Sequence, residues 1–249
     1  MASDLDDAPL APPASLLAMI RQTRFLLLLV SLAALIFVSP FVAHADIGAR
    51  AGLPEILGGV LFVAMVLAAA RAASRSPATL IAAWCLAIPL ILIWVIDLLT
   101  GPNNIGVARH ALDIVFVGYV VVLILGYLFT PAQVTANTIA ASLCIYFLLA
   151  VLWAEVYSIM ELMEPGSFVL AGSENSDEPM RLGGRATSLT LYYSLVTLTT
   201  LGYGDITPRT APARMFAAME AVTGQIYLTV LVARLVGMHI VHSTRRRTR

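Results

Sequence analysis

Residues 200–205 carry the clearest chemistry in the sequence. They read Thr-Leu-Gly-Tyr-Gly-Asp and lie between two long apolar segments. A dehydrated cation needs a stack of oxygen ligands, which consecutive backbone carbonyls can supply if the backbone alternates between unusual angles. Gly202 and Gly204 can adopt positive φ at little cost, and Thr200 adds a hydroxyl oxygen at the inner end of the stack. We therefore expect a cation to bind along Thr200, Leu201, Gly202, Tyr203 and Gly204.

The composition is that of an integral membrane protein. Of the 249 residues, 59% are hydrophobic and only 12% are charged, more apolar surface than a soluble domain of this size needs. All 15 basic residues are arginine and the net charge is zero, so the overall charge does not favour nucleic-acid binding. Cys85 and Cys144 both lie in apolar runs and are expected to be reduced packing residues, with a disulfide as the alternative. The sequence shows no phosphate-binding loop, catalytic triad or metal-ligand cluster that would indicate an enzyme or a cofactor.

Six long apolar segments predict an all-α membrane protein with six transmembrane helices. Each approaches or exceeds the roughly 20 residues that span the hydrocarbon core of a bilayer. A shorter segment, 188–200, cannot span and ends at the cation-binding loop, so we expect a re-entrant pore helix there. The six long segments are 25–43, 56–73, 78–99, 111–129, 138–160 and 213–239.

The arginines predict the orientation. With the N-terminus inside, nine arginines lie on the inner side and six on the outer side, the bias expected of membrane proteins. Both termini would then be cytoplasmic. The acidic loop after residue 160 would face outward, either as a cation-attracting vestibule or as an ordinary solvated loop. The inner arginines are Arg21, Arg24, Arg71, Arg75, Arg234, Arg245, Arg246, Arg247 and Arg249; the outer ones are Arg50, Arg109, Arg181, Arg185, Arg209 and Arg214.

The first apolar segment has two interpretations. Arg21, Arg24, the apolar run and the sequence Ala43-His44-Ala45 together resemble a secretory signal peptide with its cleavage site. The acidic leader and the length of the apolar run, about 19 residues, instead favour a retained helix. Cleavage would leave the topology of the other five segments unchanged.

The order of outer helix, pore helix, glycine-containing loop and inner helix resembles the pore domain of tetrameric potassium channels. The resemblance runs from Thr138 to the end of the inner helix, and the whole chain is similar to small bacterial six-transmembrane members with one pore loop per chain. It implies a voltage-gated-like potassium channel architecture and passive conduction of K⁺, which binds to the filter carbonyls and is the only ligand implied. One loop cannot form a ring alone, so a homotetramer follows. The implied regions are an N-terminal tail (1–24), a four-helix domain (25–130), the pore domain (131–241) and a basic tail (242–249).

The resemblance also assigns supporting roles around the filter. Tyr192 and Tyr193 occupy the place of an aromatic pair that braces the filter, and Asp205 matches the acid just outside it, where it can accept a hydrogen bond from that pair. Gly224 stands where many members have an inner-helix glycine, either as a hinge or for close helix packing. Glu220 is expected behind the filter as structural support, because intramembrane acids are costly and usually paired. Leu201 replaces the more usual valine, which should affect packing more than ion choice.

Helical geometry extends these roles to the cavity below the filter. If the inner helix follows the family register, the positions about 100° round from Gly224 face the pore. The upper two are polar and the lower two apolar, which predicts a hydrated cavity above a hydrophobic gate. Arg234 falls on the opposite side and, with the basic tail Arg245–Arg249, could bind anionic lipid, the alternative being a purely topogenic role. The pore-facing positions are Gln225, Thr229, Val232 and Val236.

The fourth segment predicts weak voltage dependence. A voltage sensor needs about 3–4 gating charges per subunit, carried by regularly spaced arginines. Segment 111–129 contains no arginine, and Arg109 lies at its outer edge. Asp97 and Asp113 are expected to pair with Arg109 as structural anchors, and Glu155 to play a supporting role.

Three rival functions are also compatible with the sequence. The chain could be a weakly selective cation channel, a subunit of an energised potassium uptake system, or a non-conducting regulatory subunit that keeps the pore fold. The intact Gly-Tyr-Gly sequence argues against the first two, and related uptake systems carry four pore repeats in one chain where this chain shows one. Potassium flux through the purified protein would separate these alternatives.

Overall fold

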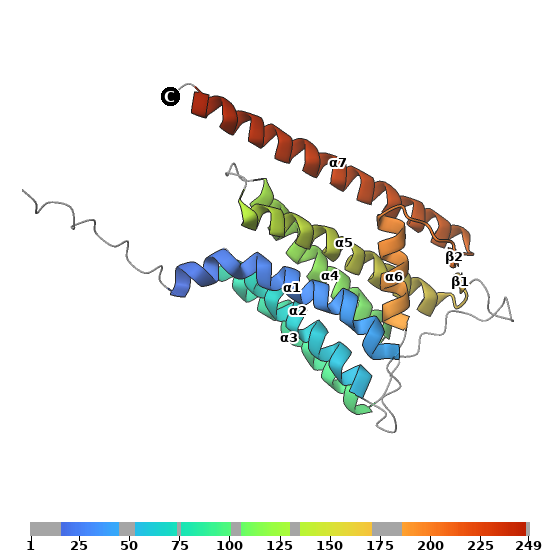
Figure 1. Ribbon diagram of the computed structural model, residues 1–249. Coiled ribbons are helices and arrows are strands. Elements are labelled where there is room, and N and C mark those ends of the chain that lie inside the picture. The colour runs from blue at the N-terminus through green and yellow to red at the C-terminus, as the bar shows by residue number, and fades with distance from the viewer. Residues whose placement is uncertain are drawn as a thin grey trace, which may run out of the picture.

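The protein folds into a set of long helices with a small sheet at one end (Figure 1). The computed structural model describes the backbone of residues 16–44, 53–73, 76–100, 106–129, 135–170 and 186–247. The elements are α1 (Leu16–His44), α2 (Leu53–Ala73), α3 (Pro77–Thr100), α4 (Gly106–Leu128), α5 (Ala136–Met163), β1 (Phe168–Leu170), α6 (Ala186–Leu198), β2 (Ile206–Pro208) and α7 (Ala211–Arg247). Each of the seven apolar segments of the sequence lies mainly or wholly within one of the helices.

Helix α5 is the centre of the molecule. It packs against α1, α4, α6 and α7, and Figure 1 shows it between the α1–α4 bundle and α7. Thr135 caps its start, because the Thr135 side chain accepts a hydrogen bond from the Thr138 N–H and the Thr138 side chain accepts one from the Thr135 N–H. The helix is apolar nearly all round, which is typical of a helix buried by neighbours on several sides. It therefore links the first four helices to the segment that holds the filter.

The core has two parts. Apolar side chains of α1, α2, α4 and α5 form the larger part, with Phe25, Leu32, Met65 and Phe116 almost fully buried. At the other end of α5 the rings of Tyr157, Phe168 and Tyr193 stack edge to face, with ring centroids 5.1 to 5.2 Å apart. Such pairs stabilise a fold beyond the burial of their surface. The aromatic part positions α6 and β1 against α5.

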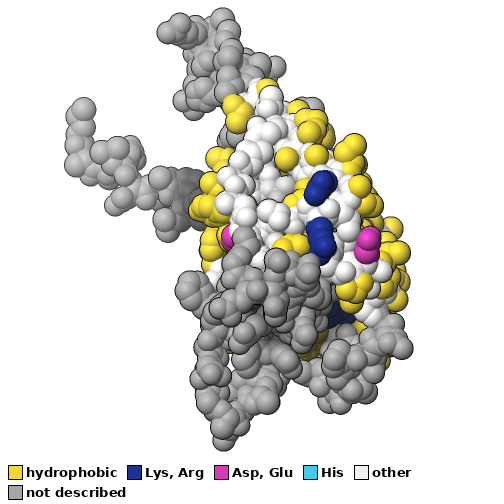
Figure 2. Space-filling model, turned by 90° about the vertical axis from the view of Figure 1, so that its right-hand side faces the viewer, with side chains coloured by type: hydrophobic (Ala, Val, Ile, Leu, Met, Phe, Trp, Pro, Cys, Tyr) yellow, Lys and Arg dark blue, Asp and Glu magenta, His cyan; other side chains and the backbone are white. Residues whose placement is uncertain are grey.

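Four of the helices are long and apolar enough to cross a membrane among the residues that the structure describes. These are the stretches Pro77–Ile96, Gly106–Leu128, Ala136–Met163 and Ala211–Arg234. The apolar stretches of α1 and α2, Arg24–Val38 and Leu57–Ala72, are shorter. Viewed from the end that carries β1 and β2, the molecule shows hydrophobic side chains along its flanks and few charged ones on its described surface (Figure 2). The protein is therefore a mostly helical integral membrane protein.

The expectation of a purely helical chain is wrong in one detail. The three-residue strands β1 and β2 form an antiparallel sheet in which Phe168 pairs with Pro208 and Leu170 with Ile206. The Arg209 N–H extends the ladder by donating to the Ser167 carbonyl at 2.8 Å. Strands this short carry little periodicity, so the sequence gives no signal for them. The sheet joins the end of α5 to the segment that follows the filter.

Candidate ion-conduction site

The backbone of the filter loop alternates in handedness. Thr200, Gly202 and Gly204 have φ values of 58°, 59° and 78°, whereas Leu201 and Tyr203 between them have negative φ. Thr200 is the one non-glycine residue with positive φ in the described part of the chain, a conformation that costs about 1–2 kcal/mol for an L-residue. Alternation of this kind turns successive carbonyl groups toward one side of the chain. The loop can therefore present a row of oxygens to a cation.

The inner half of the loop is tethered to the end of the pore helix α6. The N–H groups of Leu201 and Gly202 both donate to the Val196 carbonyl, at 2.9 and 3.4 Å, and the Thr200 N–H donates to the Thr197 carbonyl at 2.9 Å. These bonds satisfy carbonyls that a helix end would otherwise leave unpaired. The last turn of α6 thus fixes where the filter begins.

The outer half is held by Asp205. Its Oδ2 accepts a hydrogen bond from the Tyr192 hydroxyl at 2.7 Å, and its Oδ1 accepts the Ile206 N–H at 3.0 Å. The bond to Asp205 raises the pKa of Tyr192 to about 12, because the carboxylate favours the protonated phenol. Tyr193 instead lies in the aromatic part of the core, where burial raises the pKa of its hydroxyl. Tyr192 therefore stabilises the site through a hydrogen bond, and Tyr193 stabilises it through ring packing.

Glu220 lies at the junction of α5, α6 and α7. Its carboxylate is fully buried and accepts hydrogen bonds from the Tyr157 hydroxyl and the Ser194 hydroxyl, both at 2.5 Å. Ser194 Oγ also lies 2.8 Å from the Ala150 carbonyl on α5. A buried carboxylate is tolerated when its oxygens are hydrogen-bonded in this way. The sequence suggests no partner for Glu220, and Tyr157 and Ser194 carry no motif that would have identified them.

Gly224 packs α7 directly against the end of α6. A Cβ atom at this position would lie 2.2 Å from the Leu198 carbonyl oxygen, far inside van der Waals contact. Tyr146 of α5 donates a hydrogen bond to the same carbonyl at 3.4 Å. Gly224 is expected from the sequence to act either as a hinge or in close helix packing, and the structure shows the geometry of close packing.

The inner helix reaches the filter through Gln225. Its Nε2 donates to Thr200 Oγ1 at 3.2 Å, so the side chain lies directly below the loop. Thr229 lies one turn further along α7 and, like Val232, is exposed in the single chain. The side chains of Val236 and of the basic tail Arg245–Arg249 lie outside the described residues. These cavity and gate assignments stay predictions.

Two further contacts position the helices around the site. The guanidinium of Arg234 lies over the Phe129 ring, 5.3 Å from its centroid, which joins the C-terminal end of α4 to α7. At the opposite end, both carboxylate oxygens of Glu161 accept backbone N–H groups, from Gly166 at 2.7 Å and from Phe168 at 3.1 Å. Of the other acidic residues in the loop after residue 160, Glu174, Asp177 and Glu178 lie outside the described residues. One contact thus joins α4 to α7, and the other joins the end of α5 to β1.

Comparison with known proteins agrees with this arrangement. The family model described as "Ion channel" matches residues 114–240, just over half of the chain, and this range includes α5, α6, the filter loop and most of α7. The family is one of ion channels and not of enzymes. No curated protein matches the chain. No solved structure matches it either. Because the matched range contains the pore loop and both flanking helices, the chain belongs to the ion channel family.

Proposed function

We propose that this protein is a potassium-selective channel that conducts passively as a homotetramer in a bacterial inner membrane. The observation that carries the proposal is the alternating backbone of the filter, with positive φ at Thr200, Gly202 and Gly204. That geometry supports a stack of carbonyl oxygens matched to a dehydrated K⁺ ion. The Thr-Leu-Gly-Tyr-Gly sequence supports the same ion.

The surface of the single chain supports assembly. Leu201 and Tyr203 of the filter are 55% and 67% exposed, although they lie next to the pore helix. Only 11% of the most apolar stretch of α7 is buried, against 61% of that of α5. One loop can supply only one wall of a pore, so further copies of the chain around a common axis would complete the ring and cover part of α7. The six-helix topology with both termini inside belongs to the same proposal.

Selectivity is tested with a matched pair of glycine variants. Gly204 and Gly166 both have positive φ, 78° and 88°, and neither would bring a Cβ within 4 Å of another atom. Gly204→Ala and Gly166→Ala therefore add similar backbone strain, about 1–2 kcal/mol, but only the first lies in the filter. In liposomes, the wild type and Gly166→Ala should conduct K⁺ and exclude Na⁺, and Gly204→Ala should lose one or both properties.

The rival functions predict other results in the same assay. Comparable Na⁺ and K⁺ fluxes through the wild type would indicate a weakly selective cation channel. No flux through a correctly folded protein would indicate a non-conducting subunit that needs a partner. Native mass spectrometry on the same sample tests the assembly, since a mass other than four chains contradicts the homotetramer.

A further inference from the structure

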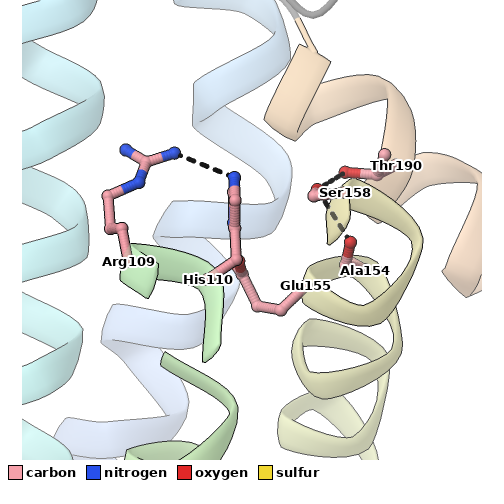
Figure 3. Close-up of polar contacts among 6 residues, drawn as sticks. All are labelled: Arg109, His110, Ala154, Glu155, Ser158 and Thr190. Carbon is pink, nitrogen blue, oxygen red and sulfur yellow. Dashed lines mark hydrogen bonds and ion pairs between the residues drawn. The ribbon is translucent and has the colours of Figure 1, made fainter. Parts of the chain in front are cut away.

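A cluster of ionisable side chains lies between α4 and α5, away from the filter. His110 and Asp113 are three residues apart on α4 and so share a helix face. Glu155 approaches them from α5, and His110 Nδ1 is hydrogen-bonded to Glu155 Oε2. One ligand atom from each of the three residues lies within 4.8 Å of the others. Figure 3 shows His110 between Arg109 and Glu155.

The cluster is buried and incompletely satisfied. His110, Asp113 and Glu155 are 6%, 5% and 5% exposed. Asp113 Oδ1 is buried and has no hydrogen-bond partner among the residues that the structure describes. A buried carboxylate oxygen without a partner is costly, because it loses its hydration and gains nothing in return. The geometry thus leaves an electron-pair donor available beside the His110–Glu155 pair.

The hydrogen bonds fix the protonation of the imidazole. Arg109 Nη2 lies 3.2 Å from His110 Nε2, and a guanidinium can only donate. Nε2 is therefore the acceptor, and the proton of a neutral imidazole resides on Nδ1, where it is donated to Glu155. With His110 neutral, one arginine faces two carboxylates. When both carboxylates are ionised, the cluster carries one excess negative charge, which favours a bound cation.

We propose that His110, Asp113 and Glu155 form a binding site for a divalent transition-metal ion of the zinc class. One imidazole nitrogen and two carboxylate oxygens are a donor set that such ions accept, with water in the remaining position. Tetrahedral ligands at zinc distances lie about 3.4 Å apart, so the widest pair must close by at most about 1.4 Å. Side-chain rotation can supply a shift of this size. On binding, the metal replaces the proton on Nδ1, and Nε2 takes up a proton in the neutral ring.

Arg109 disfavours metal binding at this site, and this effect can be tested with an Arg109 variant. When His110 Nε2 is protonated, it can no longer accept a hydrogen bond from Arg109, so metal binding breaks that bond. It also places the metal cation close to the positively charged guanidinium. Removing the guanidinium should therefore tighten metal binding. A purely structural cluster binds no metal, so loss of Arg109 would only lower the stability of the fold.

The site would join the first helical bundle to the pore helix. One turn beyond Glu155 on α5, Ser158 Oγ lies 3.2 Å from Thr190 Oγ1 on α6 and donates to the Ala154 carbonyl (Figure 3). A metal that binds α4 to α5 thus holds the part of α5 that contacts α6. Binding itself does not depend on the proposed conduction, so its test can fail or succeed independently of that function.

The experiment measures metal binding to the full-length protein in detergent. All variants are made in a protein whose other histidines (His44, His239 and His242) are replaced by alanine and whose Cys85 is replaced by serine. Any affinity tag is removed. Thermal midpoints are recorded against Zn²⁺, with Mg²⁺ as the hard-cation control, and Co²⁺ absorption reports the coordination. We expect the midpoint to rise with Zn²⁺ concentration and not with Mg²⁺, because a ligand that binds only the native state stabilises it.

Four variants decide the outcome. His110→Ala and Glu155→Gln should weaken Zn²⁺ binding by at least about tenfold, and Arg109→Gln should strengthen it. Glu161→Gln is the matched control, a buried acid on the same helix outside the cluster, and should leave the Zn²⁺ affinity unchanged. A Zn²⁺ response that is absent, or that survives in His110→Ala, overturns the proposal. A midpoint that responds to pH but to no transition metal also overturns it and identifies a proton-linked ion-pair network.

Discussion

At the scale of single residues, the Tyr192–Asp205 hydrogen bond is the main side-chain link between the pore helix and the outer end of the filter. Tyr192→Phe keeps the ring and removes this bond, which is worth about 1 kcal/mol in a partly exposed position. We expect the variant to lose sustained K⁺ flux faster than the wild type while it still excludes Na⁺. Liposome flux followed over time measures the effect.

The neighbouring tyrosine is the control for this prediction. Tyr193→Phe preserves the ring contacts with Tyr157 and Phe168 and should sustain flux better than Tyr192→Phe. Because the pKa of Tyr192 is raised to about 12, its bond is fully present below the ordinary tyrosine pKa of about 10 and is lost only as pH rises through 12. The difference between the wild type and Tyr192→Phe should therefore be constant from pH 7 to 9. Equal loss in both tyrosine variants would contradict the assignment.

Gly224 allows a second test at this scale. Gly224→Ala would place a methyl group 2.2 Å from the Leu198 carbonyl oxygen and must push α7 away from α6. Overpacking of this kind costs about 1–3 kcal/mol. We expect a lower thermal midpoint and a weakened tetramer, measured by scanning fluorimetry and native mass spectrometry.

Gly126 on α4 is the matched control for Gly224. It also lies inside a helix, but a Cβ there meets nothing within 4 Å. Alanine is favoured over glycine in a helix by about 1 kcal/mol, so Gly126→Ala should be neutral or stabilising. A Gly224→Ala protein as stable as Gly126→Ala would show that the close contact does not matter.

At the scale of elements, Glu161 connects α5 to the sheet beside the filter. Its two oxygens accept the N–H groups of Gly166 and Phe168, and Phe168 begins β1, which pairs with β2 directly after Asp205. Glu161→Gln replaces one acceptor with a donor and leaves one N–H without a partner. We expect faster hydrogen exchange at the Arg209 amide, which bonds to Ser167 at the end of the ladder.

Glu164→Gln provides the comparison for the sheet. Glu164 follows Glu161 by three residues, but it is exposed. Its substitution should leave the Arg209 exchange rate unchanged. Equal acceleration in both variants would show that Glu161 does not hold the sheet.

The sequence located the helices and indicated positive φ at Gly202 and Gly204, because both depend on local information. Long apolar runs predicted the helices to within a few residues at most ends, and both glycines of the filter loop have positive φ. Contacts between residues distant in the sequence were not predictable. Glu155 lies 45 residues from His110, and Tyr157 lies 63 residues from Glu220, so only the packing of α5 brings these pairs together. Thr200 also had no signal for its positive φ, because the loop and not the residue type imposes it.

At the scale of the whole molecule, the fourth helix lacks the row of arginines that a voltage sensor needs. Arg109 is the single arginine of α4, where a steep voltage sensor needs about 3–4 gating charges per subunit. We expect open probability in planar bilayers to vary with less than about one elementary charge per subunit. Any remaining voltage dependence should be the same in Arg109→Gln, because it would originate in the pore. A steep dependence that Arg109→Gln reduces would contradict this prediction.

The bond between Gln225 and Thr200 has a consequence for ion exit. The Thr200 hydroxyl oxygen already accepts an amide hydrogen, which withdraws electron density from the lone pairs that would face a cation. In the proposed tetramer, an ion at the inner end of the filter would compete with four amides, one from each chain, for its hydroxyl ligands. This competition would make the innermost position the weakest of the row, so α7 would set how readily an ion leaves the filter toward the inner side.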